Sequence, residues 1–78
     1  MQVGDLIKFL EDGGWVDDIN GKTAIVIAIR ADHRRRPEWW EWDCIVNGKI
    51  ESSFMLRLDE PGYLKRYGVE VLSKVCNP

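Results

Sequence analysis

The sequence is poor in histidine and cysteine and has no long hydrophobic run: its 78 residues include one histidine and two cysteines. No apolar stretch approaches the ~20 residues that span a bilayer, so we expect no membrane contact. No basic segment followed by an apolar one opens the chain, so we expect no secretory signal. The expected location is the inside of a cell, or a particle assembled there.

The few side chains that could do chemistry are poorly placed for it. Cys44 and Cys76 lack metal-ligand spacing. We interpret Cys44 as a buried thiol and Cys76 as a free one, with a disulfide as the less favoured alternative. His33 has no nucleophile paired with it, and Gly13-Gly14 precede no lysine-serine pair that would cradle a phosphate. We therefore expect no enzyme, no cofactor and no metal site.

A large excess of charge of one sign is also missing, since 11 basic and 13 acidic residues leave a net charge of −2. This balance gives no general attraction to nucleic acid or to anionic membranes. Hydrophobic residues make up 45% and charged residues 31% of the chain, which favours folding over disorder. The length predicts one small domain, residues 1–78, with a thin core.

What the sequence does contain is tryptophan, and three of its four tryptophans lie between Trp39 and Gly48. Four apolar side chains alternate with two acidic ones there: Trp40, Trp42, Cys44 and Val46 against Glu41 and Asp43. This alternation predicts a strand with one buried face and one wet face. Asn47-Gly48 predicts a tight hairpin turn after it.

The rest of the chain predicts four more strands and one helical turn. The strands are expected within Val3–Leu10, Thr23–Ile29, Lys49–Leu58 and Val69–Val75, and the turn at Tyr63–Tyr67. Together with Trp39–Val46, this order predicts a mainly β fold, a small five-stranded SH3-like barrel with a short helical turn before the last strand.

Two segments are more apolar than their expected positions require. Thr23–Ile29 does not alternate, so both of its faces are covered, or one face meets another protein, or a bulge rotates the strand. The glycine-rich loop before it contains Trp15, Val16 and Ile19. We expect these three to fold back as a lid on the core, and the alternative is that Trp15 contacts a partner.

Arginine and tryptophan meet in one connection, where Arg34, Arg35 and Arg36 precede Trp39. Trp39 comes one position before Trp40 in the expected strand, so its side chain points to the face opposite the core tryptophans. Such a cluster is typical of protein interfaces. It also suits a solvated hairpin tip packed over its own arginines, or a phosphate backbone with a base stacked on the ring. We favour the protein interface, and predict these four residues and Trp15 as the partner-binding set.

Several segments resemble a known family. Val3–Phe9 reads V-G-D-L-I-K-F, Ala24–Ile29 reads A-I-V-I-A-I, the aromatic strand is closed by Asn47-Gly48-Lys49, and Gly68–Ser73 reads G-V-E-V-L-S. In this order they resemble the small SH3-like proteins encoded in many tailed-phage genomes, over Val3–Val75. KOW and Tudor domains share the opening Gly-Asp and the barrel.

The resemblance implies a non-enzymatic protein–protein interaction module in a phage particle. Such a virion accessory would be a capsid decoration protein or a head–tail or tail component, with phage capsid or tail proteins as partners. It would be found in the virion or in the host cytoplasm. Two alternatives remain open at this point: a KOW-like nucleic-acid-binding protein, and a small regulatory inhibitor of a host enzyme.

Overall fold

The computed structural model describes residues 1–31, 38–57, 60 and 62–73. Its elements, in order, are β1 (Leu6–Phe9), the 3₁₀ segment η1 (Glu11–Gly13), β2 (Thr23–Ala31), β3 (Trp39–Val46), β4 (Lys49–Arg57), α1 (Tyr63–Arg66) and β5 (Val69–Ser73). The predicted order of four strands, one helical turn and a last strand is confirmed.

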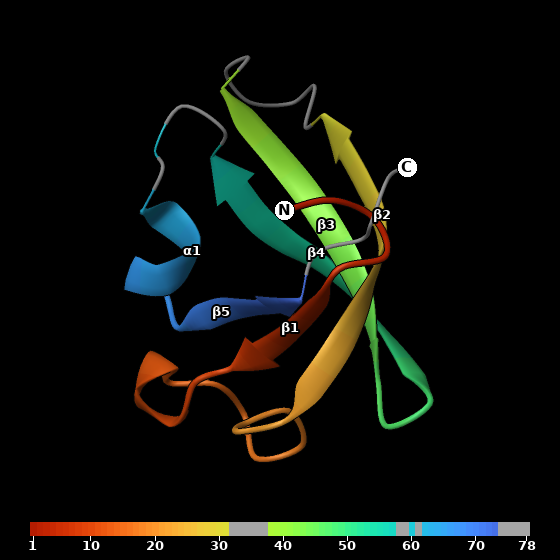
Figure 1. The fold of residues 1–78 in the computed structure, drawn as a ribbon, viewed down its shortest axis with the longest axis vertical. Helices are drawn as coiled ribbons and strands as arrows, with labels where there is room; N and C mark the ends of the chain where they lie inside the picture. Colours follow the sequence, from red (N-terminus) through yellow and green to blue (C-terminus); the bar gives the residue numbers. More distant parts are fainter. Residues whose placement is uncertain (32–37, 58–59, 61, 74–78) are drawn as a thin grey trace.

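The five strands form one antiparallel sheet in the order β4-β3-β2-β1-β5. Figure 1 shows β2, β3 and β4 as long strands that run together, with β5 nearly across them and α1 at the side of the sheet. α1 contacts both β4 and β5, which are the two edge strands. The chain is thus a mainly β protein, built on a five-stranded antiparallel sheet with a short helical turn before the last strand.

The β3–β4 hairpin follows the tryptophan-rich stretch as predicted. β3 spans Trp39–Val46, and the chain reverses through Asn47 and Gly48, whose φ angles are 52° and 76°. Positive φ at both central residues matches the right-handed twist of the flanking strands. The turn therefore fixes which residues of β3 and β4 face each other.

Trp42 lies at the centre of the core and is 1% exposed, which confirms the prediction that it is buried. Its indole stacks on Phe54 with ring centroids 4.7 Å apart, and Nε1–H donates to the Met55 carbonyl at 3.1 Å. Around it the core contains Ile7, Phe9, Ile19, Ala24, Val26, Cys44, Val46, Leu56 and Val69, with Val71 and Trp40 partly buried against them. Cys44 is a free, buried thiol, and Cys76 lies outside the described residues.

β2 and β4 each contain a bulge where they pass Asp43. In β2 the register shifts between Val26 and Ala28, so that Ile27 is the extra residue. In β4 the shift leaves Ser52 and Ser53 opposite a single residue of β3, and Ser53 has a φ of 66°. The bulge in β2 accounts for the missing alternation from Ile27 onward, as one of the three interpretations of the sequence held, whereas Ile25 lies before the bulge and is an exposed apolar residue.

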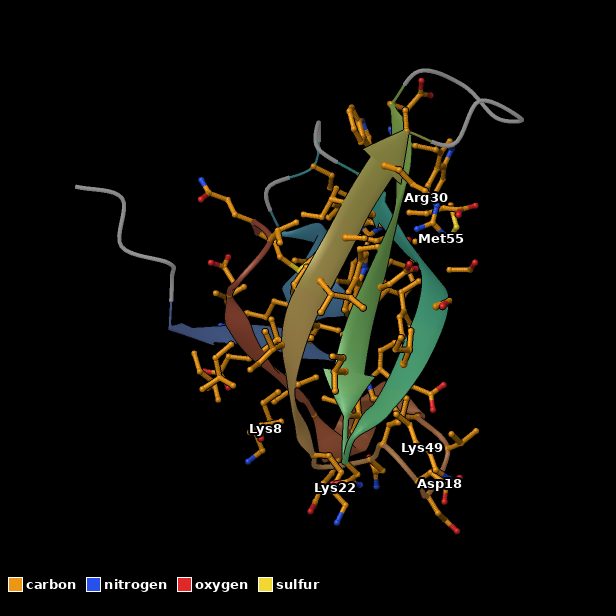
Figure 2. All side chains as sticks on the ribbon, turned by 90° about the vertical axis from the view of Figure 1, so that its right-hand side faces the viewer. Lys8, Asp18, Lys22, Arg30, Lys49 and Met55 are labelled. Atoms are coloured by element: carbon orange, nitrogen blue, oxygen red, sulfur yellow. The ribbon has the colours of Figure 1, made fainter. Side chains whose placement is uncertain are left out.

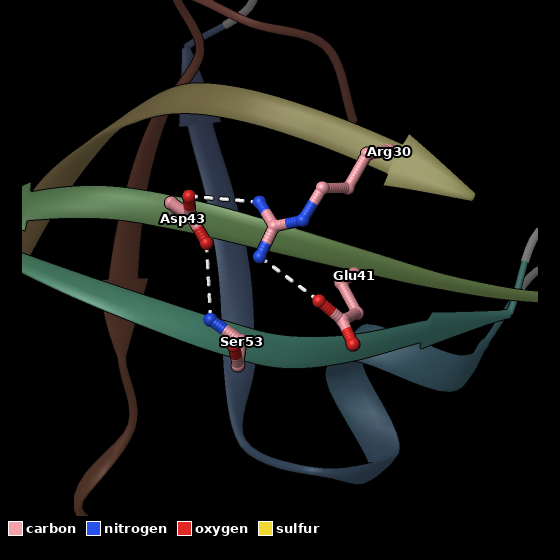
Figure 3. Close-up of polar contacts among 4 residues, drawn as sticks. All are labelled: Arg30, Glu41, Asp43 and Ser53. Carbon is pink, nitrogen blue, oxygen red and sulfur yellow. Dashed lines mark hydrogen bonds and ion pairs between the residues drawn. The ribbon is translucent and has the colours of Figure 1, made fainter. Parts of the chain in front are cut away.

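Asp43 also joins the bulged strands chemically, as Figure 3 shows. One oxygen of its carboxylate accepts a hydrogen bond from Arg30 Nη1 at 2.8 Å, and the other accepts one from the Ser53 backbone N–H at 3.0 Å. Arg30 Nη2 donates to Glu41 at 2.9 Å. The hydrogen bond from Arg30 is the main cause that lowers the pKa of Asp43.

Glu41 corrects one expectation. The alternation along β3 placed it on a wet face, yet it is only 7% exposed. A buried carboxylate is tolerable where a cation pairs with it, and Arg30 on the neighbouring strand provides that pairing.

Candidate interaction site

A pocket of about 280 Å³ lies between β4 and α1. Its aromatic lining is Trp15, Trp42, Phe54, Tyr63 and Tyr67, and the rest of the lining is Ser53, Met55, Leu64 and Val69. None of these side chains carries a formal charge at neutral pH. Small-molecule sites typically measure roughly 300–1,000 Å³, so this pocket is at the small end and suits one or two apolar side chains.

Trp15 is held at one side of the pocket by close packing of two backbone segments. Its indole Nε1–H donates to the Gly68 carbonyl at 2.9 Å. A Cβ built on Gly68 would lie 2.5 Å from the Cα of Gly13, so a side chain at either glycine would separate η1 from the start of β5. The Trp15 ring meets Phe9 and Phe54 edge-on, at centroid distances of 4.9 and 5.7 Å.

The lid predicted for this loop is confirmed in two of its three members. Ile19 is 5% exposed and belongs to the core, and Trp15 packs against it. Val16 is 68% exposed, so the prediction was wrong for this residue. The turn that ends the loop explains the difference: the backbone N–H groups of Ile19 and Asn20 bond to the Val16 carbonyl, and of the two apolar side chains only Ile19 faces inward.

The tyrosines of α1 and its C-cap form another part of the lining. Tyr63 is buried and Tyr67 is half exposed, and their ring centroids lie 4.7 Å apart. They are four residues apart, the spacing that brings two side chains together on one face of a helical turn. Burial is the main cause that raises the pKa of the Tyr63 hydroxyl, so this group is neutral at physiological pH.

Two arginine–aromatic contacts border the pocket. Trp39 of β3 meets Tyr63 edge-on at 5.9 Å, and the Arg57 guanidinium lies 5.1 Å from the centre of the Trp39 ring. The Arg66 guanidinium lies 5.0 Å from the centre of the Tyr67 ring. The result is a continuous sequence of contacts, arginine–tryptophan–tyrosine–tyrosine–arginine, across β3, β4 and α1.

The structure brings two of the five predicted partner-binding residues to this pocket. Trp15 lines it, and Trp39 borders it through Tyr63. Trp39 is half-buried rather than fully outward, because its ring packs against Tyr63 and Arg57. Arg34, Arg35 and Arg36 lie outside the described residues, so their role stays a prediction.

Sequence reasoning missed Tyr63 and Tyr67, because Tyr63–Tyr67 predicted only a helical turn. The signal that could have identified them was the pair of tyrosines at a spacing of four within that turn. Their place in the same pocket as Trp15 depends on contacts between distant parts of the chain and could not be inferred from local sequence.

Three observations concern metal ions, thiols and membranes. No group of three or more histidine, cysteine, aspartate or glutamate side chains in the described ranges is close enough to hold a metal ion. Burial raises the pKa of the Cys44 thiol to about 11, which keeps it protonated and unreactive. Among the described residues no helix has the length and apolar character needed to cross a membrane.

The geometry of this site is an aromatic pocket bordered by arginines, and it suits the binding of apolar side chains. Comparison of the chain with family models, with curated proteins and with solved structures found no match.

Proposed function

We propose that this chain is a non-enzymatic protein–protein interaction module that binds another polypeptide through the aromatic pocket between β4 and α1. The observation that carries the proposal is the lining of the pocket: five aromatic side chains and no charged one around about 280 Å³. Tyrosine, tryptophan and arginine dominate the binding energy of protein interfaces. A pocket of this size and lining accommodates an apolar anchor side chain of a partner.

The border of the pocket supports a polypeptide ligand. Arg57 and Arg66 lie over aromatic rings, and Arg66 also pairs with Glu60, and these contacts hold the planar guanidinium groups in place. A fixed guanidinium can donate to carbonyl or carboxylate oxygens of a bound chain with less loss of side-chain entropy. The expected ligand is therefore a segment with an apolar anchor and an oxygen acceptor beside it.

The larger context of the proposal is a phage particle. It rests on the likeness of Val3–Phe9, Ala24–Ile29 and Gly68–Ser73 to small SH3-like phage proteins, and it makes the chain a capsid decoration protein or a head–tail or tail component.

We also propose that the sheet closes into an SH3-like barrel, with α1 bridging β4 and β5. The contacts of α1 with both edge strands support this closure. Nuclear Overhauser contacts between side chains of β4 and β5 would test it.

The test of the function has two steps. Mass spectrometry of purified particles should find the chain at a fixed copy number. Purified chain should then rebind particles stripped of it, and Tyr67→Ala, which removes a half-exposed ring, should weaken binding by about 2 kcal/mol, or roughly thirtyfold. The control is Val3→Ala, an exposed side chain before β1 that does not line the pocket. Equal losses in both variants, or binding unaffected by Tyr67→Ala, would refute the pocket as the binding site.

A second candidate function, single-stranded nucleic-acid binding, is favoured by the same arginine–aromatic contacts, because rings beside guanidinium groups stack well on bases. Titration with a single-stranded oligonucleotide at increasing salt distinguishes the two. A nucleic-acid binder loses affinity steeply as the salt concentration rises, whereas an apolar anchor in a pocket does not.

A further inference from the structure

The outer face of the sheet, opposite the core, contains an aliphatic row that the proposed function does not use. Leu6 of β1, Ile25 of β2, Ile45 of β3 and Ile50 of β4 are consecutive partners in the register of the sheet. Ile25, Ile45 and Ile50 are 50%, 40% and 64% exposed. We call these four residues the aliphatic row. Single exposed apolar side chains are ordinary, but a contiguous set across four neighbouring strands indicates an interaction surface.

We propose that the aliphatic row is the interface of a weak, two-fold symmetric dimer of this chain. The charges on both sides of the row favour a second copy as the occupant. On one side Arg30 bonds to Asp43 and Glu41, and on the other Lys8 is the cross-strand neighbour of Glu70. A foreign partner selected by charge would require the same sign on both sides of the row, whereas one side has two acids to one base and the other side has Lys8. A second copy requires only an apolar patch whose bordering charges do not repel the same charges on the other copy.

The distribution of lysines selects one orientation for the two copies. Figure 2 shows Lys8, Lys22 and Lys49, with Asp18 beside them, towards one end of the long strands and Arg30 towards the other. A two-fold axis along the row places the lysine end of each copy over the Arg30–Asp43–Glu41 end of the other. An axis along the strands would place lysines over lysines. With the first axis, Ile25 and Ile45 each meet their own counterpart.

The size of the row predicts the strength of the dimer. Four strands about 4.8 Å apart make the row roughly 14 Å wide, and with one flanking residue on every side the footprint is about 300–400 Å² per copy. This is about half of the ~800 Å² per partner found in stable complexes. We therefore expect a dissociation constant on the order of 0.1–1 mM.

The first experiment needs no substitution. Amide spectra of the wild-type chain labelled with ¹⁵N, recorded from about 20 μM to about 1 mM, should show concentration-dependent shifts centred on Ile25, Ile45 and Ile50. Amides around Tyr67 should not move, because that residue is at the pocket. A chain that stays monomeric with constant shifts over this range overturns the proposal, and so do shifts centred elsewhere.

The second experiment removes the apolar contact but keeps the strand. Ile25→Thr combined with Ile50→Thr retains β-branched side chains, and should raise the dissociation constant measured by sedimentation velocity at least about tenfold. The matched control is Val16→Thr, an exposed aliphatic residue in the loop before β2, and it should leave dimerisation unchanged. Equal effects of both changes, or none, would contradict the proposal.

Two other occupants of the row would be revealed by a truncated chain and by particle binding. If removal of residues 74–78 moves the amides of the row while the wild type is monomeric, the chain's own C-terminal segment covers the row and the dimer is refuted. If the wild type is monomeric but Ile25→Thr/Ile50→Thr loses binding to particles, a foreign protein covers it and the dimer is again refuted. The proposed function is tested separately by Tyr67→Ala, so either proposal can fail alone.

Discussion

Gly68 provides the sharpest test of how the pocket is built. Its φ is 85°, and Gly48 in the hairpin turn has a φ of 76°. An alanine at either position adopts left-handed backbone, at a cost of about 1–2 kcal/mol. Around Gly48 nothing lies within 4 Å of an added Cβ, whereas at Gly68 the Cβ would lie 2.5 Å from the Gly13 Cα. Overpacking of this kind adds about 1–3 kcal/mol, so Gly68→Ala should cost about 2–5 kcal/mol in total.

The comparison is made by urea unfolding followed by tryptophan fluorescence, with the wild type, Gly48→Ala and Gly68→Ala. At a slope of about 1 kcal/mol/M, the extra cost at Gly68 should lower the unfolding midpoint by about 1–3 M relative to Gly48→Ala. Gly13→Ala, whose Cβ would meet Trp15 Nε1 at 2.5 Å, tests the same contact from the other side. If Gly68→Ala and Gly48→Ala agree within about 0.5 kcal/mol, the contact between η1 and Gly68 does not support the pocket.

Three further predictions follow from the core and from the outer face. Trp42→Ala should cost about 3–5 kcal/mol in the free energy of unfolding, a large part of the ~4–12 kcal/mol expected for this length, measured by the same urea assay. In a Cys76→Ser background, Cys44 should react with a disulfide reagent only in denaturant, since burial raises its pKa to about 11; rapid native reaction would contradict this. The lowered pKa of Asp43 contributes stability above the unfolded-state value of about 3.9, and this is lost as the pH falls through the folded-state value. Asp43→Asn should therefore reduce the drop in melting temperature below pH 4. If the melting temperature depends on pH in the same way in the variant and the wild type, the Asp43 carboxylate makes no such contribution to stability.

Local sequence was sufficient for the strands and for most inward-facing residues. Period two in Trp39–Val46 and the left-handed preference of Asn47-Gly48 are properties of neighbouring residues, and β3 and the turn have the predicted bounds. The missing alternation in Thr23–Ile29 was also informative, because a bulge changes which face of the sheet the following side chains meet.

Features that depend on distant residues were not predictable in the same way. Glu41 is buried because Arg30 lies on the adjacent strand in the correct register, and the spacing of the two residues along the chain does not reveal this. The pocket depends on β5 bringing Gly68 against Gly13, a contact between the two ends of the chain. The predicted interface at Arg34–Arg36 is outside the described residues, so the site proposed here rests on Trp15, Trp39 and the tyrosines.

The position of α1 has a consequence for aggregation. α1 contacts β4 and β5, the first and last strands of the sheet. Edge strands offer unpaired backbone groups to other chains, and proteins commonly shield them with short helices or loops. Unwinding this single turn would expose the parts of both edge strands that α1 contacts. We therefore expect fibril formation, where it occurs, to begin from a nearly native molecule in which only Tyr63–Arg66 has opened.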